Sequence, residues 1–118
     1  MTAPQLHHFD QMPFEKMNNL VFRKYVAGKN GMFVYFKLLK GAVIPEHHHI
    51  SEQITHIMKG HVIVKAAGQE YHLRAGDILV IPPNVPHMFT ALEDTIDYDV
   101  FSPVREDWLK GTDNYLRK

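Results

Sequence analysis

The chain has 118 residues, of which 45% are hydrophobic and 22% are charged, as is typical of one folded globular domain. Lys plus Arg and Asp plus Glu both number 13, and a neutral chain without a basic block is a poor candidate for binding nucleic acid or an anionic membrane. The absence of cysteine excludes disulfides, thiol catalysis and thiolate metal sites. No apolar stretch reaches the roughly 20 residues of a transmembrane helix, and no signal peptide is visible. We therefore expect a single cytoplasmic domain over residues 1–118.

Short strand-like segments fill most of the chain. They are rich in β-branched and aromatic residues, and clusters of Gly, Asn and Pro separate them. In chain order, strands are predicted at residues 20–27, 32–40, 53–58, 61–66, 70–74, 77–81, 88–92 and 95–101. Strands at this spacing, joined by tight turns, favour an antiparallel sandwich or barrel over a parallel sheet.

The predicted strand at 32–40 is apolar on both faces. Phe33 and Tyr35 alternate with an equally apolar set, so one face fills the interior and the other needs a second cover. We expect a homodimer to supply that cover, because two-fold dimers are the commonest oligomers. In a monomer, residues 1–19 would be the expected cover.

One short helix is predicted near the C-terminus. Ser102 is a suitable N-cap, and Pro103 suits the first helical position because its missing N–H has no partner there anyway. Gly111 can end the helix in the left-handed conformation. Residues 1–19 and the last seven residues are expected to be irregular.

Histidine is the residue type that stands out, with nine in the chain. His47 and His49 project to one face of an extended segment, because side chains two positions apart share a face. A hairpin after His49 would bring Gln53 beside the pair, and His87 follows a proline-rich turn. Three imidazoles and one oxygen ligand suit one divalent transition metal, for which Mn, Fe, Co, Ni and Zn all stay open.

The remaining histidines are not expected to bind metal. His56 lies three positions after Gln53, so in a strand it faces away from the ligand side. Exposed or rim positions are expected for His7, His8, His48, His61 and His72.

Two segments around the candidate ligands resemble the two cupin motifs. Residues 41–60 are similar to G-x5-H-x-H-x3-E-x6-G, with Gln53 in the Glu position. Residues 76–91 are similar to G-x5-P-x-G-x2-H-x3-N, although Asn84 replaces the second Gly and Ala91 replaces the final Asn. Two matches at the right spacing are more specific than either motif alone.

The cupin resemblance implies an all-β fold. It is a double-stranded β-helix, or jelly-roll barrel, here with a short C-terminal helix and a barrel core over about residues 20–102. The metal would lie in the mouth of this barrel, and the resemblance assigns its ligands to His47, His49, Gln53 and His87.

Gln53 changes the charge of the expected site. Its amide oxygen is neutral, where Glu would be an anion, so a divalent ion keeps its full double charge. This should weaken metal affinity somewhat, strengthen attraction for anions and disfavour oxygen activation. The substitution therefore favours non-redox chemistry on an anionic substrate over dioxygenase chemistry.

Two acids occur in the last predicted strand. Asp97 and Asp99 alternate with apolar residues, so both face either the barrel cavity or its rim. Inside the cavity they are costly unless they have a function, and Arg105 nearby can hold a carboxylate of a substrate. The alternative is that both acids are rim charges and that Arg105 pairs with one of them.

The segment DVFSPVREDWL, residues 99–109, is similar to the closing segment of the pectin-degradation KdgF cupins. These cupins also have Gln as the fourth metal ligand, and they open the ring of 4,5-unsaturated uronic acids. The resemblance implies catalytic or substrate-contact roles for Asp99, Phe101 and Arg105. Asp99 would be the general acid and base, Arg105 would hold the carboxylate, Phe101 would pack on the sugar, and Asp97 can share the role of Asp99.

Three functions stay open. The favoured one is a metal-dependent isomerase- or lyase-like enzyme acting on a small anionic sugar. The second is a metal-dependent dioxygenase acting on a small organic substrate, and the third is a cupin that binds a small ligand without turnover.

Overall fold

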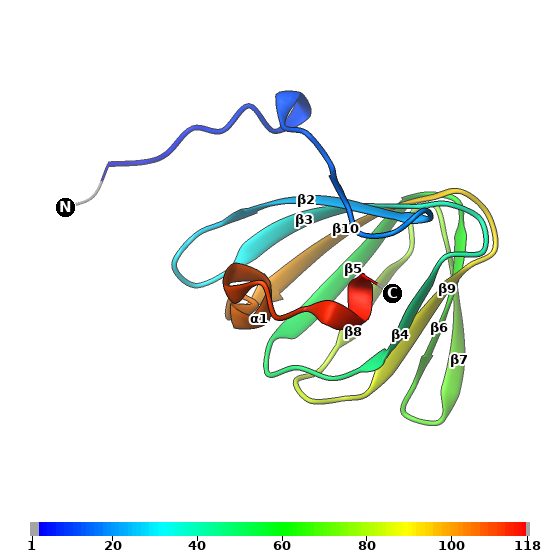
Figure 1. The fold of residues 1–118 in the computed structure, drawn as a ribbon. Helices are drawn as coiled ribbons and strands as arrows, with labels where there is room; N and C mark the ends of the chain where they lie inside the picture. The colour runs from blue at the N-terminus through cyan, green and yellow to red at the C-terminus, as the bar shows by residue number, and fades with distance from the viewer. Residues whose placement is uncertain (1–2, 118) are drawn as a thin grey trace.

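In the computed structural model, which describes residues 3–117, the chain forms two antiparallel sheets that face each other across one core (Figure 1). The strands are β1 (Glu15–Lys16), β2 (Val21–Ala27), β3 (Met32–Leu38), β4 (Val43–His47), β5 (Glu52–Lys59), β6 (His61–Ala66), β7 (Gln69–Arg74), β8 (Ile78–Ile81), β9 (His87–Ala91) and β10 (Thr95–Ser102). The helical elements are the 3-10 turn η1 (Phe9–Gln11), the helix α1 (Glu106–Lys110) and the 3-10 turn η2 (Asn114–Leu116). The predicted all-β barrel with a short C-terminal helix is confirmed.

The strand order brings β10, the last strand, beside β5, which belongs to the first cupin motif. One sheet has the order β1-β2-β3-β10-β5-β8 and the other β4-β9-β6-β7. Because β10 pairs with β5, Asp99 lies opposite Thr55 and Phe101 lies opposite Gln53. Residues more than 40 positions apart in the sequence are thus neighbours across one ladder.

The predicted strands are all present, with ends shifted by at most two residues. Two short strands were not predicted, β1 and β4. Pro45 and Glu46 in β4 weaken the strand signal, and proline is tolerated there because β4 is at the edge of its sheet.

The predicted start of the helix is wrong. Ser102 does not cap it, because this residue ends β10, opposite Glu52, and its hydroxyl donates to the carbonyl of Asn30 at 3.1 Å. The helix begins at Glu106 instead, with no side-chain cap. The predicted end is confirmed, since Gly111 takes a left-handed conformation with φ 71°.

The N-terminal segment covers part of the outer face of the six-stranded sheet. The ammonium of Lys24 lies 4.8 Å from the ring centroids of both Phe9 and Phe14 and donates to the carbonyl of Phe9 at 2.8 Å. Cation–π contacts of this kind are favourable. Phe9 also packs on Phe33, and Phe14 packs on Tyr35. One end of the doubly apolar strand β3 is therefore covered by its own chain.

Much of this outer face is still apolar and exposed, including Phe33, which Phe9 covers only in part. A cross-strand row of four side chains runs over β3, β10, β5 and β8. Its members are exposed by 37–53%, and they are Phe33, Val100, Ile54 and Val80. A continuous exposed apolar patch of this kind is typical of a protein interface.

We therefore expect a homodimer that buries this face. Ile54→Glu puts a charge at the centre of the patch, where burying it unpaired is unfavourable, so the dissociation constant should rise by about 100-fold or more. Sedimentation equilibrium at micromolar concentration measures this. Leu109→Glu, on α1 and also exposed, should leave the dimer intact, and a monomeric parent protein would contradict the prediction.

Candidate metal centre

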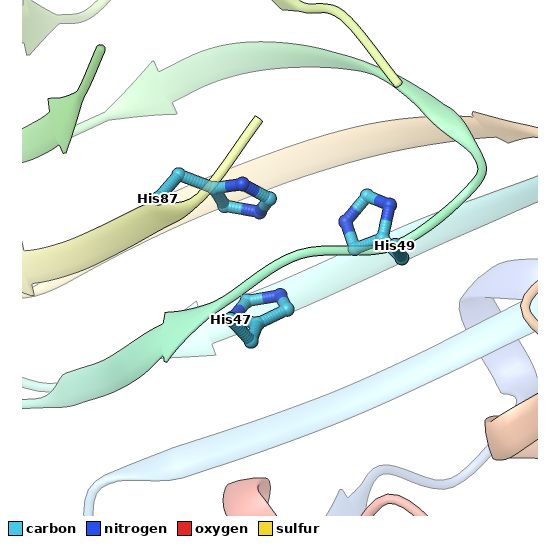
Figure 2. A group of neighbouring side chains, drawn as sticks. All are labelled: His47, His49 and His87. Atoms are coloured by element: carbon cyan, nitrogen blue, oxygen red, sulfur yellow. The ribbon is translucent and has the colours of Figure 1, made fainter. Parts of the chain in front are cut away.

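Three histidines from two parts of the chain meet at the mouth of the barrel. His47 ends β4, His49 lies in the turn before β5, and His87 begins β9. Figure 2 shows the three rings turned toward one common space. One ring nitrogen of each lies within 4.8 Å of the others, and no other group of three His, Cys, Asp or Glu in residues 3–117 is arranged to hold a metal ion.

The tautomer of each imidazole follows from its backbone contact. The Nδ1 atoms of His47, His49 and His87 lie 2.9, 2.9 and 2.8 Å from the carbonyl oxygen of a residue two positions away. A carbonyl can only accept, so Nδ1 carries the proton and Nε2 keeps its lone pair. Second contacts of this kind orient metal-binding histidines. The Nε2 atom of His87 is buried without a hydrogen-bond partner among the described residues, as a metal ligand would be.

Gln53 fits the fourth ligand position. Its amide nitrogen donates to Thr55 Oγ1 at 2.9 Å, which leaves its oxygen, Oε1, 3.2 Å from Nε2 of His49. Both facing atoms are acceptors, so they do not hydrogen bond to each other. Two ligands of one ion, with bonds of about 2.1 Å at right angles, lie roughly 3.0 Å apart. The donor set of three imidazoles and one amide oxygen therefore fits a divalent transition metal.

A hydrogen-bond chain leads from Gln53 to the predicted acid. Thr55 accepts from Gln53 and donates to Asp99 Oδ1 at 2.7 Å. Asp97 and Asp99 are both buried on the inner face of β10. The alternative that placed these acids on the rim is wrong, because the pleat of β10 turns them inward between β3 and β5.

Burial also sets the protonation of the two acids. It raises the pKa of Asp99 to about 6, against the hydrogen bond from Thr55 that favours the charged form. Burial, together with repulsion from Asp99, raises the pKa of Asp97 well above its usual range.

Arg105 lies at the same mouth, but it does not pair with either of these acids. Its Nε and Nη2 atoms donate to the two oxygens of Asp107 at 3.1 and 2.8 Å. Nη2 also donates to the hydroxyl of Tyr115 at 2.6 Å. Phe101 lies beneath, 5.2 Å from the guanidinium carbon and edge-on to His49.

Asp107 and Tyr115 were not among the predicted site residues. Asp107 is only two positions from Arg105, so the pair could have been suspected from the sequence. Tyr115 lies in a stretch without periodicity, and nothing in the sequence signals that it reaches the metal centre.

The cavity at this centre is small. Its lining includes His47, Gln53, His87, Asp99 and Tyr115. The free space is about 10 Å³, enough for one ion or one water molecule. In this conformation a monosaccharide does not fit.

The remaining histidines lie outside the centre, as predicted. His61 and His72 hydrogen bond to each other at 2.9 Å, and His56 is on the outer face, opposite Tyr98. His7, His8 and His48 are exposed.

The fold and the site together define a jelly-roll barrel whose mouth can hold a metal ion. Residues 34–101 match the family described as Cupin domain. The chain belongs to the cupin family, and the resemblance seen in its two motifs is confirmed.

Two solved cupin structures are similar over most of their length. The structure of KdgF from Halomonas sp. superposes with a TM-score of 0.79 and 31% identity, covering 84% of this chain and 94% of that one. An RmlC-like cupin from Shewanella frigidimarina superposes with a TM-score of 0.83 and 28% identity, covering 90% and 96%. Both support a small cupin as the nearest description of this chain.

A curated relative matches over a shorter stretch. Acireductone dioxygenase from Bacillus subtilis (strain 168) is 37% identical over 54 residues, which are 42% of this chain and 30% of that relative. The chain thus spans less than a third of the dioxygenase it matches. Among the described residues, no helix is long and apolar enough to cross a membrane.

We expect His47→Ala and His87→Ala each to lose the bound metal. Every lost Nε2 ligand leaves the ion short of a donor, and metal that binds only the folded chain stabilises it by mass action. Metal analysis should fall from one ion per chain to near none, and a chelator should lower the Tm of the parent protein but not of these variants. His72→Ala is the matched control. Full metal content in either site variant would show that the ligand assignment is wrong.

The metal affinity and the stability of the metal-free chain should respond differently to pH. Burial lowers the pKa of His47 to about 3 and of His49 to about 4, so the folded chain needs no deprotonation to bind metal. Its affinity should change little between about pH 7.5 and about pH 5, where free imidazole becomes protonated.

The contribution of the buried histidines to the stability of the metal-free chain should fall over that same interval. Asp97 and Asp99, whose folded pKa values are raised, contribute in the opposite direction and are removed from the comparison in an Asp97→Asn, Asp99→Asn background. Unfolded histidines take up protons below about pH 6.5 that the buried ones do not, so acid favours the unfolded state until the lowered folded pKa is reached. Calorimetric metal titration and urea unfolding at the two pH values test both halves. A steep loss of metal affinity above about pH 5 would contradict the effect of burial.

Proposed function

We propose that this protein is a non-redox, metal-dependent enzyme that opens the ring of a small 4,5-unsaturated uronate. The observation that carries the proposal is that the predicted acid, Asp99, lines the same cavity as His47, His87 and Gln53. The similarity to KdgF, over 84% of the chain, supports the same substrate class. His47, His49, Gln53 and His87 would hold the metal.

The reaction is an isomerisation, with no oxidant and no water consumed. The anomeric hydroxyl loses its proton, the bond between the anomeric carbon and the ring oxygen breaks, and an aldehyde forms. The ring oxygen leaves as an enolate, and addition of that proton to the neighbouring alkene carbon turns the enolate into the ketone of the linear keto-uronate. When bound, the metal would supply positive charge that stabilises a developing oxyanion.

Three side chains, Asp99, Arg105 and Phe101, would have separate roles in this reaction. Asp99 would carry the proton from the hydroxyl to the carbon, as general base and then general acid. Its hydrogen bond to Thr55 keeps one oxygen fixed. Arg105 would hold the substrate carboxylate, and Phe101, which lies between Arg105 and His49, would pack against the sugar.

The charge of the site suits an anionic substrate. Gln53 and the neutral imidazoles leave the charge of a divalent ion uncompensated by its ligands. Asp99 adds one negative charge when it is ionised to act as the base, and the raised pKa of Asp97 disfavours a second one. Arg105 is a further positive group at the mouth, and Asp107 pairs with it from one edge only.

The test follows the ultraviolet absorbance of the conjugated C=C bond in a free unsaturated uronate. Asp99→Asn keeps the size of the side chain but cannot accept the proton, so the rate should fall by about 100- to 10,000-fold. Metal content should stay unchanged, because Asp99 is not a ligand. Asp10→Asn, an exposed acid near the N-terminus, is the matched control. An unchanged rate in Asp99→Asn would remove Asp99 from the mechanism.

A metal-dependent dioxygenase is the second candidate. The match to acireductone dioxygenase over 54 residues favours it, and three imidazoles also suit iron or nickel. Oxygen uptake by the metal-loaded protein with an acireductone, without any loss of uronate absorbance, would support this reading. Activity on neither substrate would favour a cupin that binds its ligand without turnover.

A further inference from the structure

The end of the chain lies over the metal centre. In Figure 1 the red C-terminal part of the chain, which follows α1, crosses in front of the barrel, and its residues Tyr115 and Leu116 line the cavity at the metal centre. We call residues 114–117, which comprise η2 and Arg117, the gate segment. It follows Asp113, which is buried and lies 2.6 Å from the buried Arg23 of β2. This ion pair fixes the base of the gate segment to the barrel.

Tyr115 is the part of the gate segment that reaches the site. Its ring stacks on the ring of His47, with centroids 4.5 Å apart and planes at 30°. Its hydroxyl accepts from Nη2 of Arg105 at 2.6 Å. The side chain of Tyr115 therefore covers His47, a predicted metal ligand, and also takes a hydrogen bond from Arg105, the predicted carboxylate-binding residue.

Tyr115 blocks one edge of the Arg105 guanidinium. Asp107 occupies the edge formed by Nε and one hydrogen of Nη2. Tyr115 takes a hydrogen bond from the same Nη2, and no residue in the described range 3–117 accepts from Nη1. Nη1 and Nη2 together can bind a carboxylate through both of its oxygens. That mode is open only when the Tyr115 hydroxyl leaves.

Beyond Asp113, the gate segment is held by polar contacts at the surface, which include an ion pair of Arg117 with Asp113 at 3.6 Å, and by one buried side chain. Arg117 pairs with Glu15 at 3.0 Å, but both side chains are well exposed, and exposed ion pairs add little stability. The carbonyl of Leu116 accepts one hydrogen bond, from Asn18 at 3.2 Å. Leu116 is the one side chain of the gate segment that is fully buried.

We propose that residues 114–117 form a gate over the metal centre, and that Tyr115 is the residue which an incoming carboxylate displaces from Arg105. The gate itself follows from the small free volume of the cavity, about 10 Å³, and from the presence of Tyr115 and Leu116 in its lining. The displacement by a carboxylate rests on the proposed function, which assigns Arg105 to a uronate.

A second approach to the site exists and makes the proposal testable. A surface hollow of about 220 Å³ is lined by residues that include His49, Ser51, Arg105 and Asp107. If ligands reached the centre from this side, the gate segment would stay closed and Tyr115 would be a fixed wall.

The first experiment tests the gate without any substrate. Metal-loaded protein is mixed with excess chelator, and the release rate is measured for the parent and for Tyr115→Phe, which keeps the ring but loses the bond to Arg105. Release should be about ten-fold faster in the variant, the factor for one hydrogen bond to a charged group. Tyr71→Phe, on β7, should match the parent. Equal rates in all three proteins would overturn the gate.

The second experiment uses D-galacturonate as the carboxylate and D-galactose as its uncharged counterpart. Trp108 is the only tryptophan of the chain and lies at the cavity beside Arg105, so its fluorescence reports binding. Galacturonate, but not galactose, should change this fluorescence, and Tyr115→Phe should bind galacturonate about ten-fold more tightly because no hydroxyl competes. Weaker binding by Tyr115→Phe, or no binding of galacturonate, would overturn the displacement.

Hydrogen exchange locates the movement. The amides of Leu116 and Arg117 donate to the carbonyls of Asp113 and Asn114, and they should exchange faster when galacturonate is bound. Slower exchange would mean that the ligand enters by the other hollow and overturns the proposal. Uronate turnover is measured separately, so a gate that opens in a protein without turnover would count against the proposed function alone.

Discussion

Three backbone carbonyls hold three imidazoles in one tautomer, and the rest of the site depends on this constraint. Each carbonyl accepts from Nδ1 of His47, His49 or His87, so the three Nε2 lone pairs converge. Lone pairs that face each other repel unless a cation lies between them. Since Gln53 adds its oxygen beside His49, the barrel mouth is organised for a metal ion before any substrate arrives.

The neutral metal ligands lie at the centre of the site, and the acidic side chain of Asp99 lies farther out. The four proposed ligands are neutral, so the metal charge is available to a substrate, while Asp99 lies one hydrogen bond beyond Gln53 through Thr55. The strand β10 makes this possible, because it lies between β3 and β5 and turns its acids into the barrel. An acid near the metal, but held off it by a hydroxyl, can move protons without consuming a ligand position.

The sequence correctly predicts the strands and the helix end whose positions depend only on neighbouring residues. Alternating side chains and turn residues predicted eight of the strands, and Gly111 predicted the end of α1. The start of α1 was not predictable in this way. Ser102 is a residue type that suits a helix N-cap, but in the folded chain it pairs with Glu52 in the sheet. The strand β4 was missed because Pro45 suits only an edge, and edge position is a property of the whole sheet.

The sequence by itself determined the barrel class and the candidate ligands, since motif spacing and the two-residue repeat of a strand are short-range properties. The tertiary structure alone decided which groups surround them. The acids Asp97 and Asp99 face inward because β10 is enclosed between two strands, and Arg105 binds Asp107 and Tyr115 instead of those acids. Tyr115 reaches His47 from 68 positions away, through the anchoring of Asp113 by Arg23. Contacts of that range depend on packing, which leaves no periodic signal in the chain.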